Sequence, residues 1–264
     1  MSAGKLLQGR RYEQNNRENN GDTSLIGSNE QGLTLQEIAT QMDMAKSSAS
    51  VIVHTLLELN YIKTVENNDK KFCLGVETFM LGMKYLNELN LVKLCAKYLP
   101  AIAEKYNRTA FVAVLNGSNV VYVYKYVAQN ARLATCSIGS AKEAYATALG
   151  KAIIAFLPEE EQLSLISKID FKPFTKYTIA TPEQFTQEMR LTYSRGYAKE
   201  RGELEEITTC CAAPVFDYSG RVVAAVSLSD IYSGDKVGEE SALISDILST
   251  AREISRNLGF TPQY

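Results

Sequence analysis

The sequence predicts an α+β protein in two parts, a small N-terminal winged helix-turn-helix and a larger C-terminal antiparallel sheet flanked by helices. Residues 34–75 contain two short helical patterns, a brief interruption between them and then two strand-like runs. After Thr109 the spacing of apolar residues changes from three or four to two, and helices follow strands before strands return. A chain of 264 residues has the length of about two domains.

The helices of the first part can be located from their capping and spacing signals. Thr34 and Glu37 have the spacing of a capping box at a helix start, and residues 43–45 interrupt that helix. A longer helix is expected at residues 46–59, which contain no Gly or Pro. Its apolar residues recur at intervals of three and four, and we expect the following to be buried: Ala49, Ile52, Val53, Leu56 and Leu57.

Two short strands complete this unit as a hairpin. The strand-like runs are residues 61–65 and 71–74, and the Asn and Asp residues at 66–70 suit the turn between them. Helix, turn, helix and hairpin in this order are typical of a winged helix-turn-helix that binds DNA. Short helix pairs with hairpins also occur in domains that bind no nucleic acid, so a purely structural helical domain is the alternative.

The DNA contacts are expected on the outer side of the second helix, at its start and in the wing. The candidates are Lys46, Ser47, Ser48, Ser50, Val51, His54, Lys70 and Lys71. Residues 1–75 contain eight Lys or Arg and nine Asp or Glu, so each domain can make few phosphate contacts. We therefore expect a dimer, which doubles the number of contacts.

Composition excludes several other classes of protein. No apolar run approaches the ~18 residues of a membrane helix, and residues 1–14 lack the apolar stretch of a secretory signal, so we expect a cytoplasmic protein with no membrane partner. The five cysteines show no C-x-x-C pair and His54 is the only histidine, which argues against disulfide frameworks and zinc sites. We expect no metal and no cofactor.

Two patterns resemble enzyme motifs only in part. Residues 148–151 end in Gly-Lys but lack the first Gly of a P-loop, and Ala152 stands where its Ser or Thr would follow. Cys210 is a candidate nucleophile, but a thiol needs a base or a cation nearby, and His54 lies in the other part of the chain. We therefore expect no enzymatic activity.

Four segments follow from these patterns. Residues 1–23 are rich in Asn and poor in apolar residues, and are expected to be disordered or atypical. The winged helix-turn-helix spans 24–75, a linker helix 76–90, and the second domain 91–264. In that domain we expect strands at 111–115, 120–127, 132–138, 208–216 and 221–228, and helices at 91–102, 147–156, 158–166, 181–196 and 237–258.

Three runs of sequence resemble the IclR family of bacterial transcriptional regulators. They are the winged segment, ATALGKA at 146–152, and CCAAPVFD at 210–217 together with GRVVAAVSLS at 220–229. The resemblance implies an N-terminal DNA-binding domain, a linker helix and a GAF-like effector domain, assembled as homodimers or dimers of dimers. The chain departs from the family at Val51, where the family often has Arg, and at residues 1–23, where the family has an apolar helix.

The resemblance also implies an effector site in the second domain. The residues that match the family's site are Ala134, Lys142, Ala148, Leu149, Glu200, Cys210, Ser227 and Ser229. Ser227 and Ser229 alternate along one strand and so share a face, and free N–H groups near Ala148 and Leu149 favour an anionic ligand. A small carboxylate or sugar acid fits, with Glu200 facing a hydroxyl. The alternative is a solvent-facing pair of serines and a cysteine that only packs in the core.

Together these features predict a transcriptional regulator whose affinity for double-stranded operator DNA is modulated by a small metabolite. A dimeric small-molecule sensor that has lost DNA binding is the alternative, because the first domain is nearly neutral and its N-terminal segment is atypical.

Overall fold

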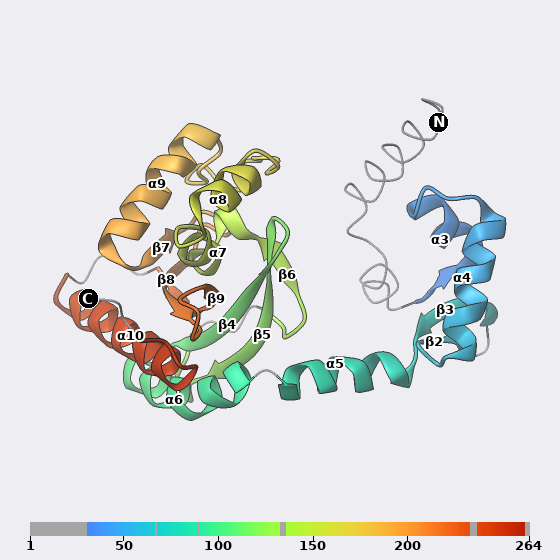
Figure 1. Cartoon of the computed structure of the whole chain (residues 1–264), viewed down its shortest axis with the longest axis horizontal. Coiled ribbons are helices and arrows are strands. Elements are labelled where there is room, and N and C mark those ends of the chain that lie inside the picture. Colours follow the sequence, from blue (N-terminus) through green and yellow to red (C-terminus); the bar gives the residue numbers. More distant parts are fainter. Residues whose placement is uncertain (1–30, 67, 89, 133–135, 233–236, 262–264) are drawn as a thin grey trace. The chain divides into compact units, whose positions relative to one another are not determined.

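The computed structural model describes residues 31–66, 68–88, 90–132, 136–232 and 237–261, and confirms the predicted α+β class (Figure 1). The chain divides into two compact units, Met1–Leu86 and Asn87–Tyr264, and each is described by itself. The expected disordered segment at residues 1–23 lies outside the described residues, as does Ala134. In the described part of the chain no helix is long and apolar enough to cross a membrane.

The N-terminal unit is a winged helix-turn-helix, as predicted. Its elements are β1 (Leu33–Thr34), α3 (Leu35–Gln41), α4 (Lys46–Glu58), β2 (Ile62–Val65) and β3 (Asn68–Leu74), and its sheet has the order β1-β3-β2. The capping box is present, because Glu37 N–H donates to Thr34 Oγ1 at 3.3 Å and Thr34 N–H donates to Glu37 Oε2 at 2.7 Å. Asp43 takes a φ of 46° in the turn between the helices, a conformation that Asp tolerates better than most residues.

A small apolar core holds this unit together. Its buried members are Leu33, Ile38, Val53 and Ile62, with Leu35, Met42, Leu56, Leu57 and Phe72 packed against them. Ile52 was expected in this core, and that prediction is wrong, because its side chain is 39% exposed. Ala49 and Val53 define the inward line of α4, and Ile52 precedes Val53 by one position, about 100° around the helix.

A single helix, α5 (Val76–Glu88), follows the wing where a linker helix was expected. Several apolar side chains in its first part are exposed, namely Val76, Phe79, Met80 and Leu81.

The C-terminal unit is built on a six-stranded antiparallel sheet of order β6-β5-β4-β9-β8-β7. The strands are β4 (Thr109–Asn116), β5 (Asn119–Val127), β6 (Ala141–Glu143), β7 (Ala198–Arg201), β8 (Thr208–Phe216) and β9 (Val222–Ile231). Helices α6 (Asn90–Tyr106) and α10 (Val237–Asn257) pack together on one face. The other face carries η1 (Ala144–Ala146), α7 (Ala148–Ile154), α8 (Glu159–Ile166) and α9 (Pro182–Arg195), and Figure 1 shows the two layers on opposite sides.

The strand predicted at 132–138 is wrong for the residues that the structure describes there. Arg132 lies in a bend, where Nε and Nη2 donate to the two carboxylate oxygens of Asp230 at 3.1 and 2.6 Å. The chain turns at Gly139, whose φ is 84°, and only the three residues of β6 then pair with β5. The prediction also missed β7, a short edge strand beside β8.

The strand register brings distant residues into two neighbouring rows on the sheet. Directly opposed residues of an antiparallel pair share a face. One row consists of Glu200 (β7), Cys210 (β8), Ser229 (β9) and Thr109 (β4). The next row consists of Ala198, Ala212, Ser227 and Phe111. These rows form the floor of the site described below.

Candidate DNA-binding surface and ligand pocket

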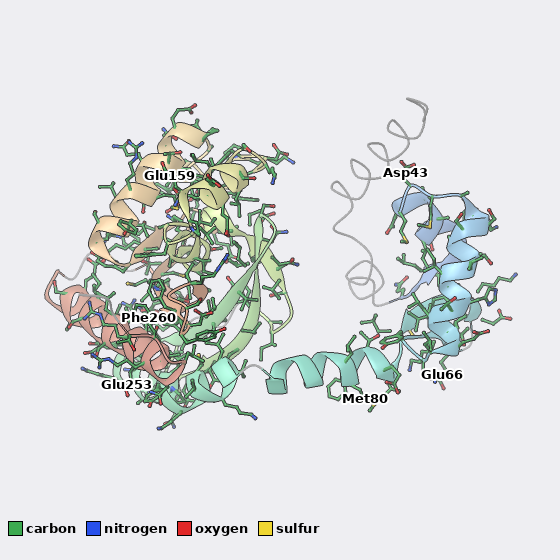
Figure 2. All side chains as sticks on the ribbon, viewed as in Figure 1. Asp43, Glu66, Met80, Glu159, Glu253 and Phe260 are labelled. Carbon is green, nitrogen blue, oxygen red and sulfur yellow. The ribbon has the colours of Figure 1, made fainter. Side chains whose placement is uncertain are left out.

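The outer side of α4 forms an exposed surface with little charge. Ala49 and Val53 are the buried residues of α4, so the side chains on the opposite side of the helix point outward. Lys46, Ser47, Ser48, Val51 and His54 are exposed, and Ser50 is half-buried. Val51 is 68% exposed, which is a large exposed fraction for an apolar side chain, and serine hydroxyls lie near it in sequence. Figure 2 shows all described side chains and labels Asp43, in the turn before this helix.

The N-terminus of α4 is open. Its N-cap residue, Ala45, has no side chain that can accept a hydrogen bond, although its carbonyl accepts the N–H groups of Ser48 and Ala49. The N–H groups of Lys46 and Ser47 meet no acceptor among the described residues, as expected for the first residues of a helix. Amide groups at a helix start favour an anion, and a DNA phosphate is one.

The wing supplies the other two predicted contacts. Lys70 is exposed on β3, and Lys71 is half-buried where β3 pairs with β1 opposite Thr34. Glu66, labelled in Figure 2, lies in the turn between β2 and β3 and adds a carboxylate to the wing. The wing therefore carries both signs of charge.

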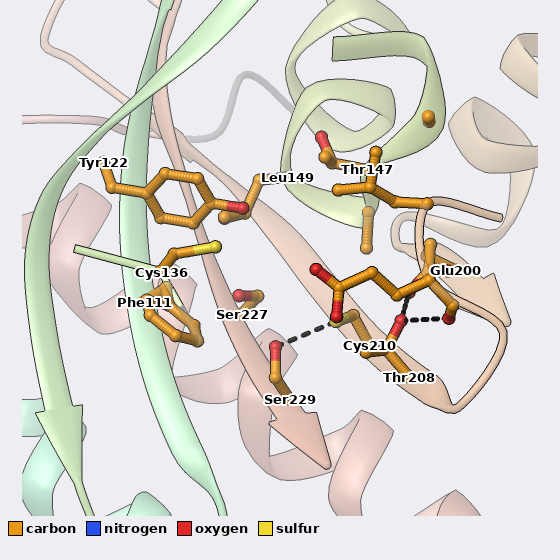
Figure 3. Close-up of a pocket in the computed structure, with 14 residues that line it drawn as sticks. Phe111, Tyr122, Cys136, Thr147, Leu149, Glu200, Thr208, Cys210, Ser227 and Ser229 are labelled. Carbon is orange, nitrogen blue, oxygen red and sulfur yellow. Dashed lines mark hydrogen bonds between the residues drawn. The ribbon is translucent and has the colours of Figure 1, made fainter. Parts of the chain in front are cut away.

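A pocket lies between the sheet and α7 in the C-terminal unit. It holds about 470 Å³ of space free of protein atoms, including its open mouth. Its lining residues are Phe111, Tyr122, Cys136, Ala146, Thr147, Ala148, Leu149, Glu200, Leu204, Glu205, Thr208, Cys210, Ser227 and Ser229. In Figure 3 the aromatic residues and Cys136 stand on one side, Glu200 and Thr208 on the other, and the two serines between them.

The roof of the pocket is the start of α7, which is fixed tightly in place. Thr147 caps the helix by accepting the N–H of Gly150 at 3.0 Å, and its carbonyl accepts the N–H of Lys151. The N–H groups of Ala148 and Leu149 take part in neither of these two hydrogen bonds, as is usual for the first residues of a helix. Gly150 lies so close to η1 that an added Cβ would be 2.1 Å from the carbonyl oxygen of Ala144.

The floor of the pocket carries three neutral polar groups. Cys210 Sγ and Ser229 Oγ are joined by a hydrogen bond of 2.8 Å, in which either atom can be the donor. Ser227 is 1% exposed, and its hydroxyl has no hydrogen-bond partner among the described residues. A buried hydroxyl without a partner is unfavourable in the empty protein, which makes Ser227 a candidate contact for a ligand. Burial raises the pKa of the Cys210 thiol well above its usual range, so this group stays protonated.

A buried charge cluster lies at the edge of the pocket. Lys151, 1% exposed, places its Nζ 2.5 Å from Glu203 Oε1. The N–H of Glu203 donates to Glu200 Oε1 at 2.6 Å. Burial raises the pKa of both carboxyl groups, and the nearby Lys151 ammonium opposes part of that rise.

Six of the eight residues expected in the effector site line this pocket: Ala148, Leu149, Glu200, Cys210, Ser227 and Ser229. Lys142 does not line it and lies on the edge strand β6, paired with Val120. Sequence reasoning missed the aromatic residues Phe111 and Tyr122, and also Leu204, Glu205 and Thr208. The alternation of β4 could have indicated Phe111, whereas no local signal marks Leu204 or Glu205 as pocket residues.

Comparison with known proteins decides the family. The description "IclR helix-turn-helix domain" matches residues 24–66, and "Bacterial transcriptional regulator IclR C-terminal" matches residues 83–256. The chain belongs to the IclR family.

IclR relatives resemble it along most of their length. The HTH-type transcriptional regulator KdgR of Dickeya chrysanthemi is 27% identical over 234 residues, which cover 88% of this chain and 75% of KdgR. The crystal structure of Thermotoga maritima IclR is 26% identical with a TM-score of 0.68 and covers 95% of this chain and 99% of that one. An IclR homologue from Microbacterium hydrocarbonoxydans, crystallised with 4-hydroxybenzoate, shares the fold at 19% identity and a TM-score of 0.69, covering 86% and 92%.

As an IclR protein, this chain is a transcriptional regulator with a helix-turn-helix DNA-binding domain and a C-terminal effector-binding domain. The winged unit is the first of these domains, and the sheet with its pocket is the second.

Proposed function

We propose that this regulator binds operator DNA as a homodimer through α4 and the wing, and that a small carboxylate in the C-terminal pocket changes its DNA affinity. The observation that carries the DNA contact is the exposed outer side of α4, with its uncapped N-terminus and Lys46 beside it. A phosphate there meets two free N–H groups, a hydroxyl and an ammonium. This action takes place in the cytoplasm, where the operator DNA of a bacterium lies.

The proposed DNA contacts divide by chemistry. Lys46, Ser47, Ser48, Lys70 and Lys71 are placed at phosphates, which fix the position of the domain. Ser50, Val51 and His54 are placed at base edges in the major groove, where an apolar side chain such as Val51 can meet only the methyl group of thymine.

A salt titration of binding to genomic fragments tests this proposal. DNA affinity should fall steeply with salt because phosphate contacts release counterions. The variant Lys46→Ala/Ser47→Ala should bind DNA more weakly and bind the effector as the intact chain does. Fluorescence anisotropy with labelled fragments measures the first quantity and calorimetry the second.

A dimeric sensor that has lost DNA binding is the second candidate. The balance of eight basic and nine acidic residues in positions 1–75 favours it. Absence of any salt-dependent DNA binding, with effector binding intact, would select this candidate over the first.

The exposed apolar residues of α5 support the homodimer. Phe79 is 68% exposed and has exposed Val76, Met80 and Leu81 close to it in sequence. Such a helix is poorly suited to water alone, and a second copy of it offers an apolar face of the same kind. The mass of the intact chain in solution tests this point, and Phe79→Glu should shift that mass toward a monomer. The same measurement distinguishes a dimer from a dimer of dimers.

The proposed effector is a monocarboxylate bound by the roof and floor of the pocket. Its acid group meets the N–H groups of Ala148 and Leu149, and its remaining polar groups meet Ser227 and Ser229. The 4-hydroxybenzoate bound by the Microbacterium homologue is a molecule of this class. Binding can change DNA affinity only if the effector favours one of two arrangements of the dimer.

Enzymatic activity is not part of this proposal. Relatives such as KdgR are named as regulators. The Cys210 thiol lies 2.8 Å from the Ser229 hydroxyl, and burial raises its pKa well above the usual range, which makes it a poor nucleophile.

A further inference from the structure

The turn between α3 and α4 carries an acidic side chain, Asp43, which Figure 2 labels. Asp43 is exposed, and its carboxylate has no hydrogen bond or ion pair with any residue that the structure describes. The turn is held by its backbone instead, because the N–H of Asp43 donates to the carbonyl of Thr40 at 3.2 Å and the N–H of Met44 donates to that of Ala39 at 3.0 Å. The fold of the turn therefore does not depend on the charge of Asp43.

Asp43 lies beside the proposed phosphate contact of the helix-turn-helix. Asp43 and Lys46 both line a hollow at the start of α4, together with the polar side chains of Gln36 and Thr40. The N–H groups of Lys46 and Ser47, which meet no acceptor among the described residues, belong to the same helix start. A phosphate bound there meets the ammonium of Lys46 and the carboxylate of Asp43 at the same time, and the formal charges of these two side chains cancel.

We propose that Asp43 limits the affinity of the helix-turn-helix domain for DNA by repelling the phosphate at the start of α4. This inference rests on the phosphate contact of the proposed function. Two like charges repel each other as strongly as two opposite charges attract at the same distance, so Asp43 offsets much of the attraction that Lys46 supplies. The repulsion acts on the phosphate backbone, which carries no sequence information, and it therefore weakens binding to every DNA sequence.

The repulsion matters most for complexes that lack base contacts. Non-specific binding depends almost entirely on phosphate contacts, and residues 1–75 contain only eight Lys or Arg to make them. Binding to an operator keeps the contributions of Ser50, Val51 and His54, which are proposed to meet base edges. Asp43 therefore reduces the time that the regulator spends on DNA outside its operator.

Two substitutions remove the charge of Asp43 and keep the backbone of the turn. Asn and Gly both tolerate a positive φ, so Asp43→Asn and Asp43→Gly should unfold at temperatures close to that of the intact chain. Fluorescence anisotropy of the full chain with a labelled duplex of mixed sequence, about 30 base pairs long, measures DNA affinity. Both variants should bind about tenfold more tightly for each domain in contact with DNA. The gain should shrink as salt is added, because salt screens the repulsion.

Asp170→Asn is the matched control, because it makes the same change at a side chain that is 77% exposed in the C-terminal unit, outside the helix-turn-helix. Its DNA affinity should equal that of the intact chain. The double variant Asp43→Asn/Lys46→Ala removes both charges at the hollow. Its affinity should lie between those of Asp43→Asn and Lys46→Ala and close to that of the intact chain, because the two effects have opposite signs.

Three results would overturn the role of Asp43 and leave salt-dependent DNA binding standing. They are an unchanged or lower affinity in both variants, a gain in only one of them, and an equal gain in Asp170→Asn, which would reflect net charge alone. If neither the intact chain nor either variant binds the duplex at about 10 mM salt, where screening is weakest, the phosphate contact itself is overturned, and this inference with it. Binding by the two variants but not by the intact chain would support the inference.

Discussion

Lys151 and Glu203 meet across 52 residues of sequence, with Nζ and Oε1 2.5 Å apart in the interior of the C-terminal unit. Their contact ties α7, which forms the roof of the pocket, to the loop that follows Glu200 on β7. The other carboxylate oxygen of Glu203 has no partner among the described residues. The pair is thus placed to hold two walls of the pocket together.

Breaking this pair from one side should destabilise the C-terminal unit strongly. Lys151→Met leaves the Glu203 carboxylate buried without a cation, and a loss of about 3 kcal/mol is expected. The double variant Lys151→Met/Glu203→Leu removes both charges and should recover much of that loss. Differential scanning calorimetry measures both variants, and equal losses in the two would contradict the argument.

Removing the unpartnered hydroxyl of Ser227 should raise the stability of the empty protein but lower its affinity for the effector. Ser227→Ala relieves a buried unsatisfied group and should stabilise the empty protein by about 1 kcal/mol, yet weaken effector binding. Ser229→Ala is the control, because that hydroxyl is bonded to Cys210 and its removal should lower stability. Thermal unfolding without ligand gives the first quantity. A loss of stability in Ser227→Ala would show that its hydroxyl has a partner in solution.

The Glu200 carboxyl should give the C-terminal unit a specific pH dependence. Its pKa is raised in the folded chain, so the folded state binds more protons than the unfolded state between the two pKa values. Its contribution is therefore complete below the unfolded pKa of about 4.5 and is lost as the pH rises through the folded value. Lowered carboxyl groups such as Asp246 act in the opposite direction.

For that reason the measurable quantity is a difference between two proteins. The stability of Glu200→Gln relative to the intact chain should increase from pH 4.5 upward and then level off. Unfolding in urea at a series of pH values provides the comparison. A constant difference would mean that Glu200 has an ordinary pKa.

Two substitutions on α4 should affect DNA binding in different ways. Val51→Ala should reduce the preference for thymine at one base pair, by about 1 kcal/mol, with little effect on non-specific binding. Lys46→Ala should weaken binding to all sequences and lower the salt dependence by about one counterion. Selection of binding sites from a random DNA pool distinguishes the two. Identical site preferences for the intact chain and Val51→Ala would remove Val51 from the proposed base contacts.

Local signals in the sequence were sufficient for much of the fold. The capping box of Thr34 and Glu37 located α3, and Thr181 and Pro182 located the start of α9, because capping involves residues only a few positions apart. The two serines of β9 were correctly predicted to share a face, since strand alternation is also local.

Features that depend on distant partners could not be read in the same way. Residues 132–138 have the composition of a strand, but Arg132 bonds to Asp230, 98 positions away. In the sequence Lys151 ends an incomplete phosphate-binding motif, whereas in the structure it forms an ion pair with Glu203. Glu205, in the loop after β7, and Phe111 line the pocket only through the pairing of β7 with β8 and of β4 with β9.

The close approach of Gly150 to Ala144 has a consequence for how a signal can leave the pocket. At Gly150, α7 lies directly against the backbone of Ala144, with no side chain between them, so the helix cannot move closer. Because Lys151 also holds Glu203, we expect movement upon ligand binding in residues 204–207, the rest of the segment that connects β7 to β8. The start of α7 would then be the wall of the pocket that stays in place, and the loop would be the wall that changes position.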